Sequence, residues 1–384
     1  MMPRAGLPHQ MEQKNNQIET LRAAAIGFVL LSHFPVAGPW FAEASRYVEL
    51  WSGVDLFFVI SGFLITASLT RLRAARADRA LWLPELKAFW IRRAFRLLPA
   101  AWLWLLIPLL LSLGLGDQPL FAPFGTLLND ALAAALQVAN LYWAHCIGSG
   151  QWGQLCSQPP IVGPYWSLSL EEQFYLLLPL LMIVLPVRRL LALVVLVIVA
   201  HALWDRPIFS LAWYVRPDSL LWGVLLALLA QRMTRSGLPA RLAAVPGRSL
   251  LSILLLAVLA WLPVNGAEFL AGVSTVAVVA LVSALLVWLA ACGAGIEPGT
   301  FLLWMGSRSY ALYLVHYPLY ALAQLMLFPT AGSSGPELAL YALCALSMIG
   351  LAAEATYRLV EMPLRNYGRG LSIQVSRRSA AQPV

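Results

Sequence analysis

The sequence predicts an all-α polytopic membrane protein with about ten transmembrane helices and with both termini in the cytoplasm. Of its 384 residues, 60% are hydrophobic and only 11% are charged, whereas a soluble domain carries about 25% charged residues. Apolar runs recur along the whole chain. Runs such as 190–200 are continuously apolar, unlike the alternating strands of an outer-membrane barrel. Basic residues gather in alternate loops, which predicts the orientation.

Ten apolar runs come near the ~20 residues that a helix needs to cross a bilayer. The candidate spans are 18–37, 51–70, 97–115, 165–186, 189–204, 216–231, 249–263, 269–291, 302–325 and 337–359. Residues 125–145 are also apolar but are interrupted by polar side chains, which predicts an interfacial or re-entrant segment. Around a membrane domain at 18–367 we expect a disordered cytoplasmic N-terminus, 1–17, and a cytoplasmic tail, 368–384, polar and disordered from about Ser372.

The formal net charge of +8 has a topological explanation. Basic residues crowd the loops after the second, fourth and sixth spans and the C-terminal end, whereas the intervening loops hold almost none. Such loops face the cytoplasm, so the chain needs an even number of spans and residues 116–164 lie outside. We therefore expect a lipid bilayer, and no nucleic acid, as the partner of these charges. No cleavable signal peptide is evident, because the first apolar run carries Arg22 and His33.

The four cysteines fall into two classes. Cys292 and Cys344 lie in or beside apolar runs, where packing explains them. Cys146 and Cys156 flank a polar, glycine-rich loop. If that loop faces an oxidising side, the two can form a disulfide, and the sequence leaves this open. There is no CxxC motif and no metal-ligand spacing, so we expect no metal site.

Polar side chains in the first two spans are functional candidates, because such groups are costly inside a membrane. Arg22 and His33 are eleven residues apart and share one helix face. Arg22 either snorkels to the interface or serves a site, and His33 is either structural or a proton acceptor. Asp55 either interacts with the helix dipole or orients His33. Gly53 and Gly62 predict a close helix approach.

The fourth span contains two adjacent carboxylates in the stretch GPYWSLSLEEQFYLLLP, residues 163–179. Ser169 and Glu172 fit a capping box at the start of the helix. Ser167, Glu171 and Tyr175 instead recur at i, i+4 and i+8, which places a polar stripe on an apolar helix. Two acids are more than capping needs, so both are candidates for the chemistry. The candidate substrate-binding residues of this span are Trp166, Ser167 and Tyr175.

Further polar groups precede or enter the other spans. The arginines before the third span either set topology or clamp a phosphate, since guanidinium groups bind phosphates bidentately. They are Arg92, Arg93 and Arg96, of which we expect Arg92 and Arg96 to share a face. Arg216 and Asp218 open the sixth span, where the two side chains can pair with each other. Tyr313 and His316 share one face of the ninth span, either lining a cavity or forming a packed hydrogen-bond network.

These residues form three groups along the membrane. An outer cluster contains His33, Asp55, Glu171 and Glu172; a middle stripe contains Tyr313 and His316; an inner basic rim contains Arg92, Arg93 and Arg96. Two classes of function fit this arrangement. One is a transporter that uses the acids and histidines as a proton relay. The other is a transferase that takes a phosphate-bearing donor from the cytoplasm.

The motifs and their order resemble the acyltransferase-3 family of membrane O-acyltransferases over residues 18–367. The matching elements are Arg22 with His33, GVDLFFVISGFLI, RRAFRLLP, PYWSLSLEEQFY, Arg216 with Asp218, SYALYLVHYPL and YRLVEMPLR. The resemblance implies transfer of an acyl group, commonly acetyl, from cytoplasmic acetyl-CoA to a hydroxyl group at the bacterial inner membrane. The implied acceptors are a cell-surface polysaccharide, lipopolysaccharide, a lipid-linked precursor, or a small metabolite such as a macrolide.

The resemblance also implies roles for the candidate residues. The Arg22–His33 pair is expected to be essential. His33 is expected to act as general base, oriented by Asp55 or Glu171, or else as nucleophile. In an alternative interpretation, Glu171 or Glu172 instead binds sugar hydroxyls from the outer side. The residues expected to hold the donor are Arg22, Arg92, Arg93, Arg96, Tyr313 and His316, and Arg216 and Asp218 join the substrate side. Some family members carry an additional extracytoplasmic hydrolase-like domain. Because the expected membrane domain leaves no room for one in these 384 residues, we expect this membrane core to act alone or with a separate partner.

Overall fold

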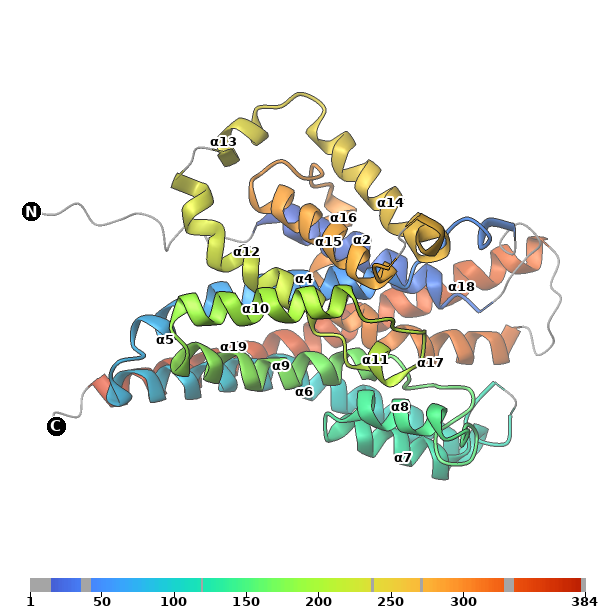
Figure 1. Cartoon of the computed structure of the whole chain (residues 1–384). Helices are drawn as coiled ribbons and strands as arrows, with labels where there is room; N and C mark the ends of the chain where they lie inside the picture. The colour runs from blue at the N-terminus through green and yellow to red at the C-terminus, as the bar shows by residue number, and fades with distance from the viewer. Residues whose placement is uncertain are drawn as a thin grey trace, which may run out of the picture.

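The computed structural model describes residues 15–35, 43–118, 120–235, 238–269, 272–327 and 335–380. Nearly all of these residues are helical, and they contain no β-strand (Figure 1). The helices are α2 (Asn16–Ser32), α4 (Ser52–Ser68), α5 (Thr70–Ala74), α6 (Arg79–Leu115), α7 (Phe124–Ala135), α8 (Ala139–Gly148), α9 (Tyr165–Val184), α10 (Val187–Ala202), α11 (Leu211–Tyr214), α12 (Asp218–Arg235), α13 (Leu238–Ala243), α14 (Arg248–Phe269), α15 (Thr275–Ala291), α16 (Thr300–Ser307), α17 (Ser309–Leu327), α18 (Gly335–Thr356) and α19 (Met362–Ala380), with a π-helical turn η1 (Tyr357–Glu361) before α19.

Four helical segments among the described residues are long and apolar enough to cross a membrane: Arg79–Leu115, Tyr165–Val184, Arg248–Gly266 and Gly335–Ser376. Two shorter apolar helices are Ser52–Ser68 and Thr275–Ala291. Large apolar side chains on the outside of the bundle fit a lipid surface, since Val184, Leu351 and Leu359 are 74%, 74% and 75% exposed. The prediction of a helical membrane protein is confirmed. Each of the ten predicted spans overlaps a described helix, and the span 302–325 is divided between α16 and α17. The number of crossings and the orientation stay predictions.

Helices α4 and α12 approach each other closely at two glycines. A Cβ atom on Gly62 would lie 2.0 Å from the Leu220 carbonyl oxygen, and one on Gly223 would lie 2.2 Å from that of Val59. A Cβ on Gly53 would lie 2.7 Å from the Ala25 carbonyl oxygen in α2. The predicted role of Gly53 and Gly62 is therefore confirmed, and these contacts hold α2, α4 and α12 together at the centre of the molecule (Figure 1).

Residues 125–145 form the two short helices α7 and α8 rather than a further span. Figure 1 shows them as a separate lobe beside one end of the main bundle. The Cys146–Cys156 disulfide closes the loop that follows α8, which decides the alternative that the sequence left open. The buried Asp130 of α7 fixes the same loop, because its carboxylate accepts hydrogen bonds from the backbone N–H and the hydroxyl of Ser157.

Two predictions about the chain outside the spans are wrong where the structure describes it. The arginine-rich segment before the third span is not a loop, because α6 continues without interruption from Arg79 to Leu115. The tail from Ser372 is not disordered, because α19 runs to Ala380 and lies along α6. Residues 1–14 and 381–384, the remainder of the predicted disordered ends, lie outside the described residues. Asn16 and Gln17 already belong to α2.

Candidate functional site

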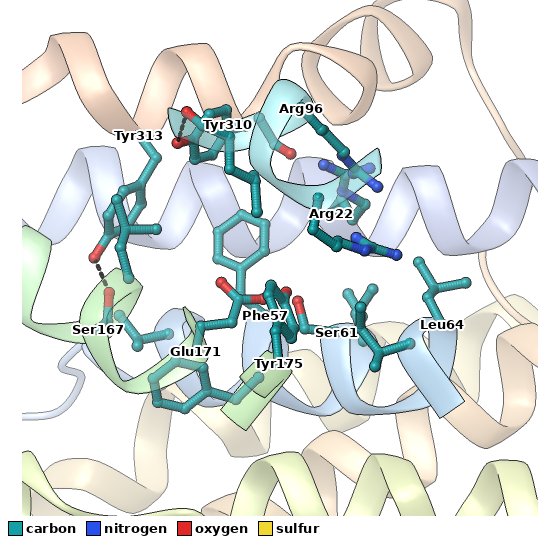
Figure 2. A pocket seen from close by; sticks show the side chains of 18 residues that line it. Arg22, Phe57, Ser61, Leu64, Arg96, Ser167, Glu171, Tyr175, Tyr310 and Tyr313 are labelled. Atoms are coloured by element: carbon teal, nitrogen blue, oxygen red, sulfur yellow. Dashed lines mark hydrogen bonds between the residues drawn. The ribbon is translucent and has the colours of Figure 1, made fainter. Parts of the chain in front are cut away.

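A cavity lies between α2, α4, α6, α9 and α17 (Figure 2). Its volume is about 80 Å³, several times the roughly 10–15 Å³ that one water molecule requires on the same measure. The polar side chains that line it are Arg22, Ser61, Arg93, Arg96, Ser167, Glu171, Tyr175, Ser309, Tyr310 and Tyr313. Apolar side chains, including Phe57 and Leu64 of α4, complete the wall. Such a mixture of an apolar wall and a few convergent polar groups is typical of a ligand site.

The arginines gather at one end of this cavity, as Figure 2 shows for Arg22 and Arg96. Arg22 of α2 forms an ion pair with Glu19 at 3.4 Å. Arg93 lies with its guanidinium 5.4 Å from the centre of the Tyr175 ring. Arg93 and Arg96 are three residues apart and share one face of α6, so both line the cavity. Arg92 shares a face of α6 with Arg96, as expected from their i, i+4 spacing, but it does not line the cavity.

Glu171 faces the same cavity from α9, between the arginine end and the opposite end (Figure 2). Its carboxylate accepts a hydrogen bond from the Tyr175 hydroxyl one turn later. Glu172 is not part of the lining but interacts electrostatically with Arg93 and Arg96. The predicted capping box is wrong, because α9 begins at Tyr165. Ser169 lies inside the helix, and its hydroxyl accepts a hydrogen bond from the backbone N–H of Ala139.

The end of the cavity opposite the arginines is marked by a hydroxyl pair. The hydroxyl oxygens of Ser167 and Tyr313 are 2.6 Å apart (Figure 2). The Tyr313 hydroxyl also donates to the carbonyl oxygen of Pro164 at 3.0 Å. These contacts join α17 to the start of α9 and fix the Tyr313 ring. Trp166 lies in the same turn of α9 and is not among the lining residues.

His33 and His316 lie beyond Tyr313 and contact each other. The distance from His33 Nδ1 to His316 Nε2 is 3.0 Å, and the rings stack with centroids 5.1 Å apart. The Tyr313 ring centre is 5.6 Å from that of His316, so Tyr313 connects the histidine pair to the cavity. Neither histidine lines the cavity itself. The structure therefore separates His33 from Glu171, and the predicted outer cluster does not form.

The Asp55 carboxylate bonds to Arg216 and Ser219 rather than to His33. It accepts hydrogen bonds from the Arg216 guanidinium at 3.0 Å and from the Ser219 hydroxyl at 2.7 Å. Asp218 instead pairs with Arg206 at 2.7 Å. The suggested pairing of Arg216 with Asp218 is therefore wrong, and so is the expectation that Asp55 orients His33.

Arg216 is enclosed by tryptophan rings, which explains why it is fully buried. Its guanidinium carbon lies 3.6 Å from the ring centre of Trp213, 5.1 Å from that of Trp166 and 5.4 Å from that of Trp51. Cation–π contacts of this kind stabilise a cation away from water. Trp166 and Arg216 thus support the wall behind the cavity, and neither they nor Asp218 lines it.

Sequence reasoning missed several residues near the cavity. Tyr310 and Ser61 line it, and the Tyr310 hydroxyl donates to the Leu97 carbonyl oxygen at 2.8 Å. Tyr310 precedes Tyr313 by three residues, so helical spacing was the signal that could have found it. Glu361 of the π-helical turn η1 interacts electrostatically with Arg22 and Arg96. Single π-turns occur often at functional sites, but no sequence pattern predicts one here.

A family model described as an acyltransferase domain matches residues 15–354. The chain belongs to the acyltransferase-3 family. The matched range contains every residue that lines the cavity, so the cavity is part of the acyltransferase domain. This match confirms the family that the sequence motifs indicated.

Three curated relatives illustrate the family. YrhL of Bacillus subtilis, provisionally named a peptidoglycan O-acetyltransferase, is 28% identical over 344 residues, which cover 82% of this chain and 50% of the relative. The peptidoglycan O-acetyltransferase OatA of Listeria monocytogenes is 28% identical over 370 residues, or 91% of this chain and 56% of OatA. A Staphylococcus aureus protein provisionally named an O-acetyltransferase is 26% identical over 383 residues, or 91% and 57%. The chain thus spans about half the length of the curated relatives that it matches. No solved structure matches it.

Proposed function

We propose that this protein is a multi-pass O-acyltransferase of the bacterial inner membrane. In this proposal it moves an acetyl group from cytoplasmic acetyl-CoA to a hydroxyl group of a cell-surface carbohydrate or of its lipid-linked precursor. The observation that carries the proposal is the cavity with three arginines at one end and, at the other, the Ser167–Tyr313 pair that leads to His33 and His316.

The arginine end suits the phosphate groups of coenzyme A. Arg93 and Arg96 both line the cavity, so an anionic ligand in it would meet their guanidinium groups. Guanidinium groups bind phosphates through paired hydrogen bonds. Arg22 adds a third positive charge in the same wall. We assign Arg22, Arg93 and Arg96 to the donor, and we leave Arg92 out of this set.

The opposite end suits the chemistry of acyl transfer. The donor's narrow pantetheine arm would run from the arginines past Glu171 and Tyr175 toward Tyr313. His33 would then take the proton of the acceptor hydroxyl as general base, and the Tyr313 hydroxyl would stabilise negative charge on the thioester oxygen. Glu171, which binds Tyr175, would hold the shape of this passage.

The direction of transfer in the proposal follows from two independent features. The excess of basic residues in alternate loops favours a cytoplasmic side at the arginine end. The Cys146–Cys156 disulfide favours an oxidising compartment for the lobe made by α7 and α8. A carbohydrate acceptor is favoured by the names of YrhL and OatA, both of which refer to peptidoglycan.

Thiol release in sealed liposomes tests the proposal. Purified protein is supplied with acetyl-CoA and an N-acetylglucosamine pentamer as acceptor. We expect free coenzyme A thiol, together with a pentamer heavier by one acetyl group in the mass spectrum. His33→Ala should abolish both signals while the protein still inserts, whereas His201→Ala, at the end of α10, should retain them.

The same experiment separates the transferase from the transporter. A proton-coupled transporter would move substrate across the sealed vesicles without coenzyme A and would release no thiol. Acetyl transfer by His33→Ala at the wild-type rate would remove His33 from the proposed mechanism.

A further inference from the structure

His33 is the first member of a chain of hydrogen bonds that ends on the backbone. His33 Nδ1 lies 3.0 Å from His316 Nε2, and His316 Nδ1 lies 2.7 Å from the carbonyl oxygen of Tyr313. His316 is fully buried, whereas His33 is partly exposed at the end of α2. Neither Asp55 nor Glu171 takes part in this chain.

The backbone end of the chain determines where each proton lies. A carbonyl oxygen only accepts hydrogen bonds, so His316 Nδ1 must carry a proton that it donates to Tyr313. In a neutral imidazole the other nitrogen then has no proton and accepts. His316 Nε2 therefore accepts from His33 Nδ1, which must be the protonated nitrogen of His33. His33 Nε2 is left with a free lone pair.

The other proton arrangements are unfavourable at this site. If His316 carried its only proton on Nε2, two acceptor lone pairs would face each other at 2.7 Å. If His316 carried both protons, its charge would lie in a fully buried position, among the rings of Tyr313, Tyr317 and Tyr320. Burying an unpaired charge costs several kcal/mol or more. The neutral chain from His33 to Tyr313 is the arrangement in which both of its hydrogen bonds join a donor to an acceptor.

We propose that His316 is a positioning residue that holds His33 in the tautomer whose Nε2 is basic. This inference rests on the proposed function and replaces the expectation that His316 binds the donor. His33 takes the acceptor's proton on Nε2 while the hydroxyl oxygen forms a bond to the thioester carbon. The carbon–sulfur bond then breaks, and the thiolate recovers that proton from His33 as coenzyme A thiol. His316 remains neutral throughout, since its own proton stays on Nδ1 and is donated to the Tyr313 carbonyl oxygen.

Two substitutions at residue 316 separate positioning from packing. His316→Gln places an amide oxygen near the former Nε2, where it can accept from His33 Nδ1. His316→Asn is shorter and reaches Tyr313 but not His33. We expect Gln to retain most of the wild-type kcat. We expect Asn to lower kcat on the order of 10²-fold, the lower end of what a general base contributes. The KM for acetyl-CoA should be unchanged in both variants, because His316 does not line the cavity.

The matched control is His201→Asn, the same replacement in a histidine of α10 that bonds the carbonyl oxygen of Val197; it should behave as wild type. Equal kcat values for His316→Gln and His316→Asn would overturn the inference. So would a loss that appears in the KM for acetyl-CoA rather than in kcat.

A spectroscopic measurement tests the same inference without any activity. Nitrogen-15 NMR of histidine-labelled protein in liposomes reports which ring nitrogen carries the proton, and the variants assign the signals. We expect Nδ1 to be protonated in both His33 and His316, and His33 to lose this tautomer in His316→Asn only. A proton on Nε2 of His33 in the wild type would overturn the inference. Absence of thiol release by the wild type would instead reject the proposed function and leave the tautomer result standing.

Discussion

The Asp55 carboxylate accepts a hydrogen bond from the Arg216 guanidinium at 3.0 Å, and both side chains are fully buried. The two residues are 161 positions apart in the chain, and their contact joins α4 to the start of α12. The pair answers a question that the sequence left open, because Asp55 was a candidate for orienting His33. It is instead a structural ion pair behind the cavity.

Removing one member of this pair should destabilise the fold strongly. Arg216→Ala leaves the Asp55 charge buried without its partner, and such losses cost about 3–5 kcal/mol. We expect a clear fall in the thermal unfolding temperature in detergent. Arg46→Ala is the control, because the side chains of its ion pair with Glu43 are 72% and 56% exposed, and exposed pairs contribute under about 1 kcal/mol. Similar losses from both variants would contradict a structural role for the buried pair.

The contact between α4 and α12 should not tolerate a methyl group. In Gly62→Ala the new Cβ would lie 2.0 Å from the Leu220 carbonyl oxygen, so the helices must separate, and overpacking typically costs about 1–3 kcal/mol. Gly27→Ala in α2 meets no atom within 4 Å and should stabilise its helix by up to about 1 kcal/mol. The unfolding temperatures of the two variants should move in opposite directions. A Gly62→Ala protein as stable as wild type would show that α4 and α12 do not pack this closely.

Loss of Arg93 should weaken the binding of the donor more than the binding of the acceptor. A hydrogen bond to a charged group contributes about 1.5–3 kcal/mol, which corresponds to a rise in KM of about 10- to 100-fold. We expect this rise for acetyl-CoA in Arg93→Ala and little change in the KM for the acceptor. Arg79→Ala removes the same charge from an exposed position at the start of α6 and should leave both constants as in the wild type. An unaltered donor KM in Arg93→Ala would exclude Arg93 from the donor site.

The stability of the lobe made by α7 and α8 should depend on pH through Asp130. Burial raises the pKa of Asp130 from 3.8 to about 6, against the opposing effect of its hydrogen bonds from Ser157. Folding therefore favours the protonated acid. This contribution is fully present below about pH 3.8 and is lost as the pH rises through about 6. The measurement is the thermal unfolding temperature at several pH values.

Asp130→Asn provides the comparison, because the amide is neutral at every pH and can still accept from the Ser157 N–H. We expect this variant to be more stable than wild type above pH 6 and similar to it near pH 4. Parallel pH curves for the two proteins would mean that Asp130 does not titrate in this range.

Much of the fold followed from local sequence. Continuous apolar runs predicted helices and a membrane protein, and the four long segments from Arg79–Leu115 to Gly335–Ser376 confirm it. Glycine positions predicted close helix contacts at Gly53 and Gly62. The spacing of Arg22 and His33, together with the motifs of the fourth and ninth spans, indicated the family that the match over 15–354 shows. These features are visible in sequence because they depend on composition and on helical periodicity.

The sequence by itself therefore determined the helices, their apolar character, the family and the set of polar residues that matter. Only the tertiary structure decided which of those residues meet. His33 contacts His316, 283 positions away, and not Asp55; Arg93 lines the cavity and Arg92 does not. The physical reason is that helical periodicity assigns a side chain to a face, whereas the neighbour of that face depends on how the helices rotate and slide against one another. In this protein that register depends on long-range contacts such as Gly62 against Leu220, which no local pattern encodes.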